Sequence, residues 1–299
     1  MSPPPIRTVG MTMTYGSSRG VSDLDLQVDH GEVFGFLGPN GAGKTTTIRV
    51  LLDHLRPSAG TAEIFGLDCH HQSVEVHRRI GYVPGDLALY ERLTARGQLD
   101  WLARLRGVDV TARRDELAER FELELDRPIK ELSKGNRQKV GLVQAFMHDP
   151  DLLVLDEPTS GLDPLMQDEF QQLLRESVAG GRSVFLSSHS LDEVQHVADR
   201  VGIIREGVLA TVSSVEDLQA KALRQLAIRF AEPVAPAVFA GLAGVGEVTV
   251  DDEGTRLRFS VTGPLDPIVK AAAAHQVVDL LSEPADLDEI FLAFYRGDE

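Results

Sequence analysis

A short glycine-rich stretch near the N-terminus has the residue types and spacing needed to bind phosphate. Residues 38–45, GPNGAGKT, match the pattern G-x-x-x-x-G-K-[ST] between an apolar strand and a predicted helix. Its glycines let backbone N–H groups curve around phosphate oxygens, while Lys44 can reach the β and γ phosphates and the Thr45 hydroxyl can hold Mg²⁺. This phosphate loop predicts a nucleoside triphosphate site formed by Gly38, Pro39, Asn40, Gly41, Ala42, Gly43, Lys44, Thr45 and Thr46.

Two adjacent carboxylates follow an apolar run later in the chain. The run LLVL ends at Asp156 and Glu157, and α/β sheets bind ligands at the carboxyl ends of their strands. Asp156 is suited to Mg²⁺ coordination, and Glu157 to polarising the water that attacks the γ phosphate. The guanine-reading pattern N-K-x-D is absent from the sequence, which favours ATP over GTP.

A second stretch offers a separate seat for an anion. In residues 132–140, LSKGNRQKV, small residues stand where a helix begins. Ser133 and Gly135 expose backbone N–H groups at the positive end of that helix. Because the phosphate loop already binds one nucleotide, the question is which phosphate this second seat contacts.

The charge of the chain argues against two classes of partner. The 299 residues have a formal net charge of −16, from 30 Lys and Arg against 46 Asp and Glu. Proteins bind nucleic acid and anionic lipid through basic residues. Because acidic residues dominate in this chain, we expect no nucleic-acid partner. Three observations predict a cytoplasmic protein. The chain has a single cysteine, MSPPPIRTVG contains no apolar leader, and no apolar run reaches about 20 residues. Any membrane association then requires a partner.

The order of apolar and amphipathic segments predicts an α/β fold of the P-loop NTPase type. Strands in GEVFGFL, RIGYVP, DLLVLDEP and RSVFLSSHS alternate with helices, which indicates a mostly parallel sheet. Helical periodicity through residues 88–148 predicts an inserted helical subdomain. The stretch VGIIREGVLATV predicts a hairpin that turns at Glu206 and Gly207.

The last third of the chain predicts a second domain. We expect one domain over residues 1–216 and a C-terminal accessory domain over residues 217–299. Strands and helices in the order β-α-β-β-α-β, with a hairpin that turns in DDEG, predict a small α+β domain of the ferredoxin-like type. Residues 287–297, LDEIFLAFYRG, predict a final amphipathic helix.

Four motifs in a fixed order give the chain a resemblance to a known family. LSKGN precedes LLVLDEP, SGLD at residues 160–163 follows it, and FLSSHS ends the next strand with His189. This order resembles the ATP-binding subunits of ABC transporters, in which LSGGQ is the signature motif. The resemblance covers roughly the first 215 residues, and it is closest to the ATPases of drug and antibiotic exporters that carry a short C-terminal extension.

The resemblance implies an answer to the question of the second phosphate seat. In this family two ATPase domains dimerise head to tail, and the signature helix of one encloses the ATP that the other binds. Ser133, Gly135 and Asn136 would then contact the γ phosphate held by a partner. His189 would contact the γ phosphate of its own domain, and Asp163 would link the two sites across the interface.

Other positions either match the family or depart from it. Tyr15, in MTMTYG, matches the aromatic residue that stacks on adenine, although an ordinary core or surface tyrosine is the alternative. Lys134 and Asn136 replace the third and fifth signature residues, whereas Ser133 and Gly135 are retained. We therefore expect a working phosphate seat.

The metal site departs from the family at one position. After the strand in RIGYVP the family has a glutamine that helps complete the metal shell, but this chain has Gly85 followed by Asp86. Asp86 is a candidate metal ligand together with Thr45 and Asp156. In the alternative interpretation, the metal relies on Thr45, Asp156 and water alone.

The resemblance implies an ATP hydrolase that drives transport, as an exporter, through separate membrane-spanning permease subunits. ATP and Mg²⁺ would be enclosed in a homodimer or in a pair with a second ATPase subunit. The permease would dock on residues 91–130 and the loop at Gly85, holding the protein peripherally on the inner face of the cell membrane.

Two other functions compete with export. One is an importer subunit, and the other is a non-transport ABC-type ATPase. Non-transport members have a second phosphate loop, long heptad insertions or zinc-binding cysteines, and the sequence has none of these. For the C-terminal domain the sequence leaves two roles open, namely stabilising a dimer or another interaction, and sensing a small molecule.

Overall fold

The computed structural model describes residues 2–16, 18–221, 224–251 and 254–283. The chain forms two compact units that divide between residues 213 and 214, whereas the sequence predicts a boundary at residue 216. Each unit is described by itself below. Within the described residues, no helix is both long enough and apolar enough to cross a bilayer.

The first unit is built around a six-stranded, mostly parallel sheet, as the sequence predicts. Its strands β3, β7 and β8 consist wholly of buried residues, the pattern of parallel strands that are covered on both faces. In order across the sheet the strands are β10 (Val208–Ser214), β9 (Arg200–Arg205), β3 (Val33–Leu37), β8 (Ser183–Ser188), β7 (Leu152–Asp156) and β6 (Ile80–Val83).

The hairpin between β9 and β10 turns where the sequence predicts. Glu206 has a φ of 49° and Gly207 a φ of 80°. Two successive residues with positive φ form the primed turn that suits the right-handed twist of a hairpin. The turn also contacts the phosphate loop, because the Gly207 N–H donates to the carbonyl of Ala42 over 2.8 Å.

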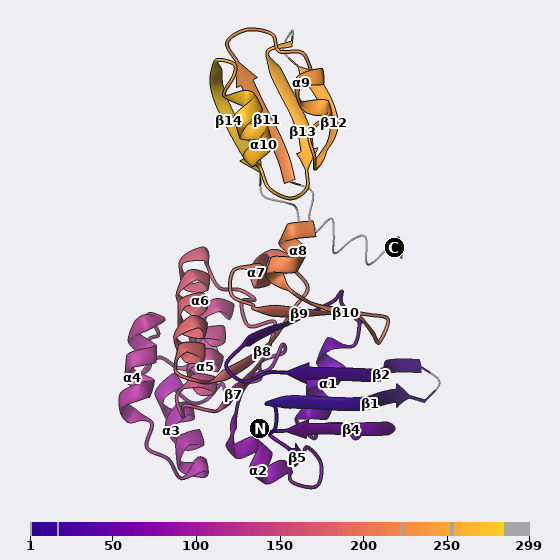
Figure 1. The fold of residues 1–299 in the computed structure, drawn as a ribbon. Helices are drawn as coiled ribbons and strands as arrows, with labels where there is room; N and C mark the ends of the chain where they lie inside the picture. Colours follow the sequence, from indigo (N-terminus) through magenta and orange to yellow (C-terminus); the bar gives the residue numbers. More distant parts are fainter. Residues whose placement is uncertain (1, 17, 222–223, 252–253, 284–299) are drawn as a thin grey trace. The chain divides into compact units, whose positions relative to one another are not determined.

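A four-stranded antiparallel sheet has two strands before the phosphate loop in the chain and two after it, and the sequence analysis missed this sheet. Side chains of this sheet and of helix α1 (Lys44–Leu51) share one hydrophobic core with Phe34, Phe36 and Phe185 of the parallel sheet. Helix α1 therefore packs between the two sheets (Figure 1). In order the strands are β2 (Ser18–Val28), β1 (Ile6–Tyr15), β4 (Ala59–Ile64) and β5 (Leu67–Asp68).

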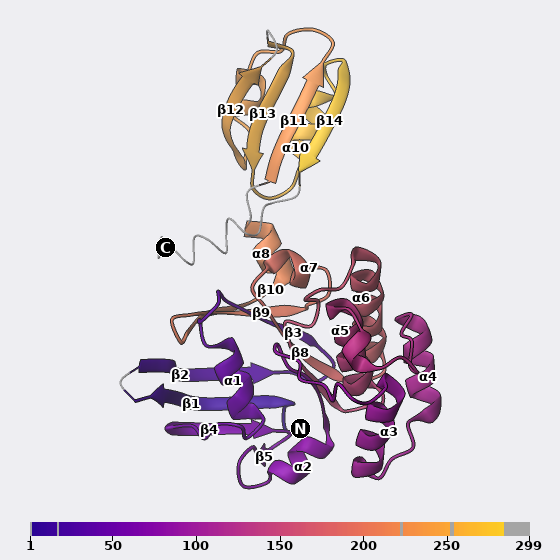
Figure 2. The ribbon, with the colours of Figure 1, turned by 180° about the vertical axis from the view of Figure 1, so that it is seen from behind.

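The helical region that the sequence predicts contains three α-helices and a 3₁₀ turn. These elements lie together with α6 beside the parallel sheet (Figures 1 and 2). Short helices α2 (Ser73–Arg78) and α7 (Leu191–Gln195) complete the unit. The helices of this region and the one they pack against are α3 (Ala95–Arg106), α4 (Thr111–Arg120), η1 (Ile129–Glu131), α5 (Lys134–Phe146) and α6 (Pro164–Ala179).

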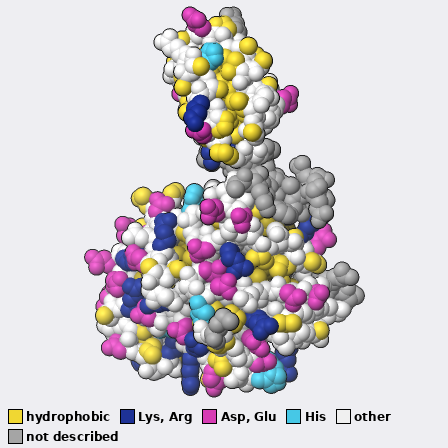
Figure 3. Space-filling view, in the orientation of Figure 1, with side chains coloured by type: hydrophobic (Ala, Val, Ile, Leu, Met, Phe, Trp, Pro, Cys, Tyr) yellow, Lys and Arg dark blue, Asp and Glu magenta, His cyan; other side chains and the backbone are white. Residues whose placement is uncertain are grey.

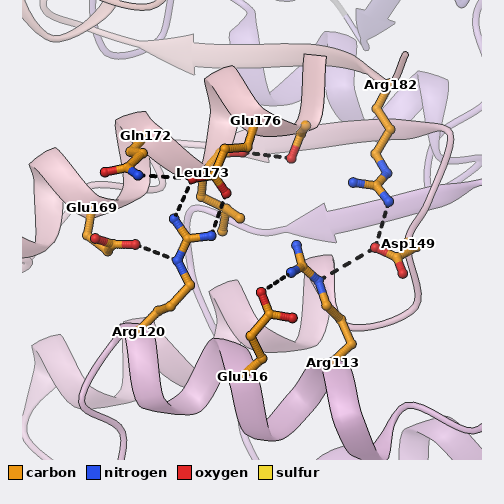
Figure 4. A network of polar contacts seen from close by, with 10 residues as sticks. Arg113, Glu116, Arg120, Asp149, Glu169, Gln172, Leu173, Glu176 and Arg182 are labelled. Carbon is orange, nitrogen blue, oxygen red and sulfur yellow. Dashed lines mark hydrogen bonds and ion pairs between the residues drawn. The ribbon is translucent and has the colours of Figure 1, made fainter. Parts of the chain in front are cut away.

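A network of ion pairs joins α4 to α6 (Figure 4). Arg120 of α4 lies 2.5 Å from Glu169 and 2.5 Å from Glu176, both on α6. Its hydrogen bond to Glu176 lowers the pKa of that carboxyl group. Arg113 extends the network to Asp149, with Nε 3.6 Å from the carboxylate. Because one guanidinium bridges two carboxylates, the network fixes α4 against α6.

The second unit has the order β-α-β-β-α-β that the sequence predicts. Its antiparallel sheet, in the order β12-β13-β11-β14, has the ferredoxin-like arrangement. The turn in DDEG and the helix expected over residues 287–297 fall wholly or partly outside the described residues. The elements are α8 (Val215–Lys221), β11 (Arg224–Phe230), α9 (Ala237–Ala240), β12 (Val245–Asp251), β13 (Arg256–Val261), α10 (Asp266–Ala272) and β14 (Val277–Glu283).

A half-buried histidine just after the end of α5 bonds to β6. The Nε2–H of His148 donates to the carbonyl of Ile80 over 3.1 Å. Burial, reinforced by the positive charge of Arg106, lowers the pKa of His148 to about 4. The imidazole is therefore neutral in the folded protein at neutral pH.

This histidine predicts a pH dependence of stability. Between pH 6.5 and about 4 the unfolded chain binds a proton at His148 that the folded chain does not, so the free energy of unfolding falls as the pH is lowered through that window. His148→Gln can keep the bond to Ile80 without titrating, and we expect it to reduce the loss by about 1–3 kcal/mol. Urea unfolding at pH 7 and pH 5, followed by the fluorescence of the single tryptophan, Trp101, measures the difference. The exposed control His71→Gln should keep the original pH slope, and an unchanged slope in His148→Gln would refute the assignment.

Candidate functional site

The phosphate loop is held between a buried strand and the helix packed between the two sheets. It leaves the end of β3 and enters α1 at Lys44. Gly43 has a φ of 114°, and a Cβ at that position would lie 2.9 Å from the carbonyl oxygen of Gly20. Only glycine suits this point, where the loop turns into the positive N-terminal end of the helix.

The loop forms one wall of a cavity of about 430 Å³, whose other walls come from the ends of β6 and β7. The cavity brings together most of the residues expected to bind nucleotide and metal. It also includes Arg49 and Tyr82, which the sequence analysis missed, whereas Gly38 and Ala42 do not line it. The lining residues are Pro39, Asn40, Gly41, Gly43, Lys44, Thr45, Thr46, Arg49, Tyr82, Pro84, Gly85, Asp86, Asp156 and Glu157.

Asp156 is a buried carboxylate that two hydroxyl groups hold in place. It is 1% exposed, and its Oδ2 accepts a hydrogen bond of 3.0 Å from the Thr45 hydroxyl. Its Oδ1 accepts from the hydroxyl of Ser187 on β8. Oxygen donors at the end of a strand, beside a phosphate loop, are the ligands that Mg²⁺ prefers. Thr45 and Asp156 therefore fit a magnesium site.

Gly85, which stands where the family has a glutamine, leaves space beside the Asp156 carboxylate. A Cβ at Gly85 would lie 3.2 Å from Asp156 Oδ2, closer than ordinary van der Waals contact. Asp86 lines the same cavity. The ring of Tyr82 also stands close by, and burial together with the charge of Asp156 raises the pKa of its phenol to about 12. Gly85 therefore leaves Asp156 without a side-chain neighbour at this position, and the Asp86 carboxylate lines the same cavity.

Glu157 lies between a lysine and a histidine. Its Oε1 is 3.4 Å from the ammonium group of Lys44, and its Oε2 is 2.7 Å from Nδ1 of His189. The backbone of Glu157 has a φ of 49°, a left-handed conformation that costs about 1 kcal/mol or more outside glycine. The Glu157 N–H donates to the carbonyl of Ser187 over 3.2 Å, which helps to hold this turn. Lys44 and His189 therefore contact the two oxygens of one carboxylate, although His189 itself does not line the cavity.

The second phosphate seat lies elsewhere on the same unit. Ser133 caps the start of α5 by accepting a hydrogen bond from the Asn136 N–H, and Ser133 is exposed. Gly135 approaches the loop after Glu157 closely, because a Cβ there would lie 2.5 Å from the carbonyl oxygen of Gly161. Neither Ser133, Gly135 nor Asn136 lines the cavity. The phosphate loop and the predicted second seat therefore lie on separate surfaces of the chain.

The loop that follows Glu157 connects these two surfaces. Gln138 of α5, which the sequence analysis missed, donates to the carbonyl of Pro158 over 2.8 Å. Lys134 donates to the Ser160 hydroxyl over 3.1 Å. Asp163 ends the loop by capping α6, where its carboxylate accepts from the Met166 N–H. Asp163 is exposed and lies outside the cavity.

Tyr15 stands at the end of β1, next to the first turn of α1. Its hydroxyl lies 3.4 Å from the Thr46 hydroxyl, and the residue is 44% exposed. An exposed ring beside the phosphate loop can stack on a base. The side chain does not line the cavity itself.

Comparisons with known proteins agree with this geometry. Residues 21–160 match the family model described as ABC transporter. The chain is 42% identical over 208 residues to a bacitracin transport ATP-binding protein of Bacillus licheniformis, covering 68% of each chain. It is 34% identical over 296 residues to a daunorubicin resistance ATP-binding protein of Streptomyces coeruleorubidus, covering 95% of this chain and 93% of that one.

A solved structure supports the same assignment. The structure of an ATP-binding subunit of an ABC transporter superposes with a TM-score of 0.68 at 30% identity, over 72% of this chain and 91% of that chain. The phosphate loop, the Asp156–Glu157 pair and the α5 seat all lie in the matching unit. The chain belongs to the ABC transporter family, in which it is an ATP-binding subunit.

Proposed function

We propose that two copies of the chain enclose MgATP between them and that its hydrolysis drives export through separate membrane-spanning subunits. The observation that carries the proposal is the separation of the two phosphate-binding surfaces within one chain. The cavity holds Lys44 and Glu157, whereas Ser133 and Gly135 face solvent or lie half-buried elsewhere. A second copy in a head-to-tail arrangement would place its α5 start over the open cavity. Leu165, 76% exposed beside Asp163, would be covered in the same contact.

The residues around the cavity suit phosphoryl transfer to water. Lys44 would neutralise charge on the β and γ phosphates, and Glu157 would orient and polarise the attacking water. His189, hydrogen-bonded to Glu157, would hold that carboxylate and contact the γ phosphate. Mg²⁺ bound by Thr45 and Asp156 would supply further charge neutralisation. The α5 start of the second copy would add the N–H groups and exclude water.

Export is the direction that the relatives support. Two of them are named for bacitracin transport and for daunorubicin resistance, and resistance to a drug is most simply achieved by removing it. For this chain we infer an export role with an antibiotic-like substrate. The face of the ATPase unit that Figure 3 shows has acidic and basic side chains interspersed, without the broad basic patch that nucleic acid requires.

The helical region offers a surface for the permease. Tyr90 and Trp101 meet edge to face with ring centroids 5.1 Å apart, and they are 56% and 38% exposed. Leu105, one turn along α3 from Trp101, is 66% exposed. Such an apolar patch near the loop at Gly85 is suited to docking a membrane subunit, which would hold the protein at the inner face of the membrane.

The role proposed for Asp86 can be tested through the metal dependence of ATP hydrolysis. If Asp86 supports the metal, Asp86→Asn should raise the Mg²⁺ concentration needed for half-maximal ATPase activity about 10-fold, because one carboxylate beside the site loses its charge. The matched control is Asp115→Asn on the exposed surface of α4, which should leave the requirement unchanged. An unchanged Mg²⁺ requirement in Asp86→Asn would mean that Thr45, Asp156 and water suffice.

Enclosure of ATP by two copies can be tested by light scattering. Glu157→Gln should block hydrolysis and accumulate the closed pair, so MgATP should convert monomer to dimer. Ser133→Arg in the same background should abolish the conversion, since a bulky cation would fill the seat at the start of α5. Arg137→Ala, one turn further along the helix, serves as the control. A Glu157→Gln chain that binds ATP but stays monomeric would contradict enclosure by two copies.

A further inference from the structure

A buried hydroxyl group stands where an apolar face of the parallel sheet ends. Ser187, near the end of β8, is 0% exposed. The parallel register places it beside Phe36 of β3 and Asp156 of β7, and Phe185, two residues earlier on β8, lies on the same face. A hydroxyl group among such neighbours is unfavourable unless it is hydrogen-bonded. The bonds that Ser187 makes therefore indicate why a polar residue stands there.

The Ser187 hydroxyl takes part in two hydrogen bonds, and both involve the acidic pair. It donates to Oδ1 of Asp156. The N–H of Glu157 lies 3.3 Å from Ser187 Oγ and 3.2 Å from the Ser187 carbonyl oxygen. Because a backbone N–H only donates and an ionised carboxylate only accepts, the single hydroxyl proton must point toward Asp156. One hydroxyl group thus contacts two consecutive residues of the site.

The bond to Asp156 decides which of its two carboxylate oxygens adjoins the cavity. Oδ1 is turned toward Ser187, which does not line the cavity. Oδ2 accepts from the Thr45 hydroxyl, and a Cβ at Gly85 would lie 3.2 Å from it. Thr45 and Gly85 both line the cavity. A donor that holds Oδ1 therefore keeps Oδ2 directed to the proposed metal site.

The same hydroxyl group contacts the backbone turn at Glu157. The φ of 49° at Glu157 is unfavourable for a residue with a side chain, so its surroundings must hold it. Of the two acceptors of the Glu157 N–H, the Ser187 carbonyl belongs to the backbone, whereas the hydroxyl depends on the side chain. A shift of this turn would displace the Glu157 carboxylate from Lys44 and His189, which contact its two oxygens.

We propose that Ser187 is a positioning residue for ATP hydrolysis. Its hydroxyl group orients Asp156 for the metal and holds the turn that directs Glu157 into the cavity. This inference rests on the roles proposed above for Asp156 in the metal site and for Glu157 as the base. Since one hydroxyl group serves both carboxylates, its removal weakens metal binding and turnover together.

Ser183 provides a matched control on the same strand. It is 1% exposed at the start of β8, and its hydroxyl accepts a hydrogen bond of 3.0 Å from the Gly31 N–H. Like Ser187 it is a buried, hydrogen-bonded serine, but it lies at the other end of the strand and does not line the cavity. Ser183→Ala therefore measures the cost of deleting a buried hydroxyl group from β8 without disturbing the acidic pair.

Binding of a fluorescent ATP analogue, with Mg²⁺ and with EDTA, tests the effect on the metal without requiring hydrolysis. In Ser187→Ala, the Mg²⁺ concentration that gives half of the change in analogue affinity should rise about 10-fold. Affinity in EDTA should stay close to that of the original chain, because the phosphate loop is intact. Ser187→Thr keeps a hydroxyl group and should restore the original Mg²⁺ requirement. A requirement in Ser187→Ala no higher than in Ser183→Ala would overturn the proposal.

Turnover at saturating Mg²⁺ tests the effect on Glu157. The kcat of Ser187→Ala should be several-fold lower than that of Ser183→Ala, while the KM for ATP changes little, since the phosphate-loop contacts remain. Melting temperatures of the two variants show whether a loss of stability accounts for the difference. A kcat that returns to the original value at saturating Mg²⁺ would overturn the link between Ser187 and Glu157.

A double variant separates this inference from the function on which it rests. Asp156→Asn should abolish the effect of Mg²⁺ on analogue binding, and adding Ser187→Ala should cause no further loss, because the hydroxyl group acts through Asp156. A further loss of affinity in the double variant would overturn the proposal. If Asp156→Asn leaves the effect of Mg²⁺ unchanged, the proposed metal site is wrong and the role of Ser187 falls with it. If only Ser187→Ala leaves that effect unchanged, the metal site stands and the role of Ser187 alone is wrong.

Discussion

A buried carboxylate sets the geometry of the nucleotide site. Asp156 is 1% exposed at the end of the buried strand β7, and a carboxylate in that position must be satisfied by hydrogen bonds or by a cation. Its two hydroxyl partners come from α1 and from β8. Because Thr45 at the start of α1 bonds directly to Asp156, the phosphate loop cannot shift without disturbing this carboxylate. The edge of the cavity that we propose for Mg²⁺ is therefore tied directly to the buried strands β7 and β8.

The same strand end also connects the cavity to the second phosphate seat. Directly after Asp156 the chain turns through the left-handed Glu157 and enters the loop that Gln138 and Lys134 of α5 hold. The close approach of Gly135 to Gly161 leaves no room for a larger residue. A movement of Glu157 during ATP hydrolysis would thus displace the start of α5 through the contacts that Gln138, Lys134 and Gly135 make with this loop. We regard this short path as the physical link between hydrolysis and the opening of the proposed dimer.

Local sequence signals predicted the strands, the phosphate loop and the Glu206–Gly207 turn, because each rests on burial periodicity or on backbone preferences within a few residues. The β-α-β-β-α-β order of the second unit was predicted for the same reason. Ser187, Gln138 and Tyr82 were missed, since they matter only through contacts with residues distant in the sequence. The antiparallel sheet was also missed, although the partly alternating burial of β1, from Ile6 to Tyr15, has a counterpart in the apolar–polar alternation of its sequence. The roles assigned to Asp86, His189 and Asp163 stay predictions, because each depends on a ligand or a second chain.

The central claim is that one catalytic site takes residues from two chains, and mixing two inactive variants tests it directly. Glu157→Gln lacks the base but keeps the α5 seat, whereas Ser133→Arg keeps the base but lacks the seat. In a mixed pair, one cavity has an intact Glu157 and faces an intact Ser133. The account predicts ATPase activity in the mixture that neither variant has alone, greatest at equal amounts of the two. A mixture no more active than its separate components, with both chains folded and binding ATP, would contradict a site shared between two copies.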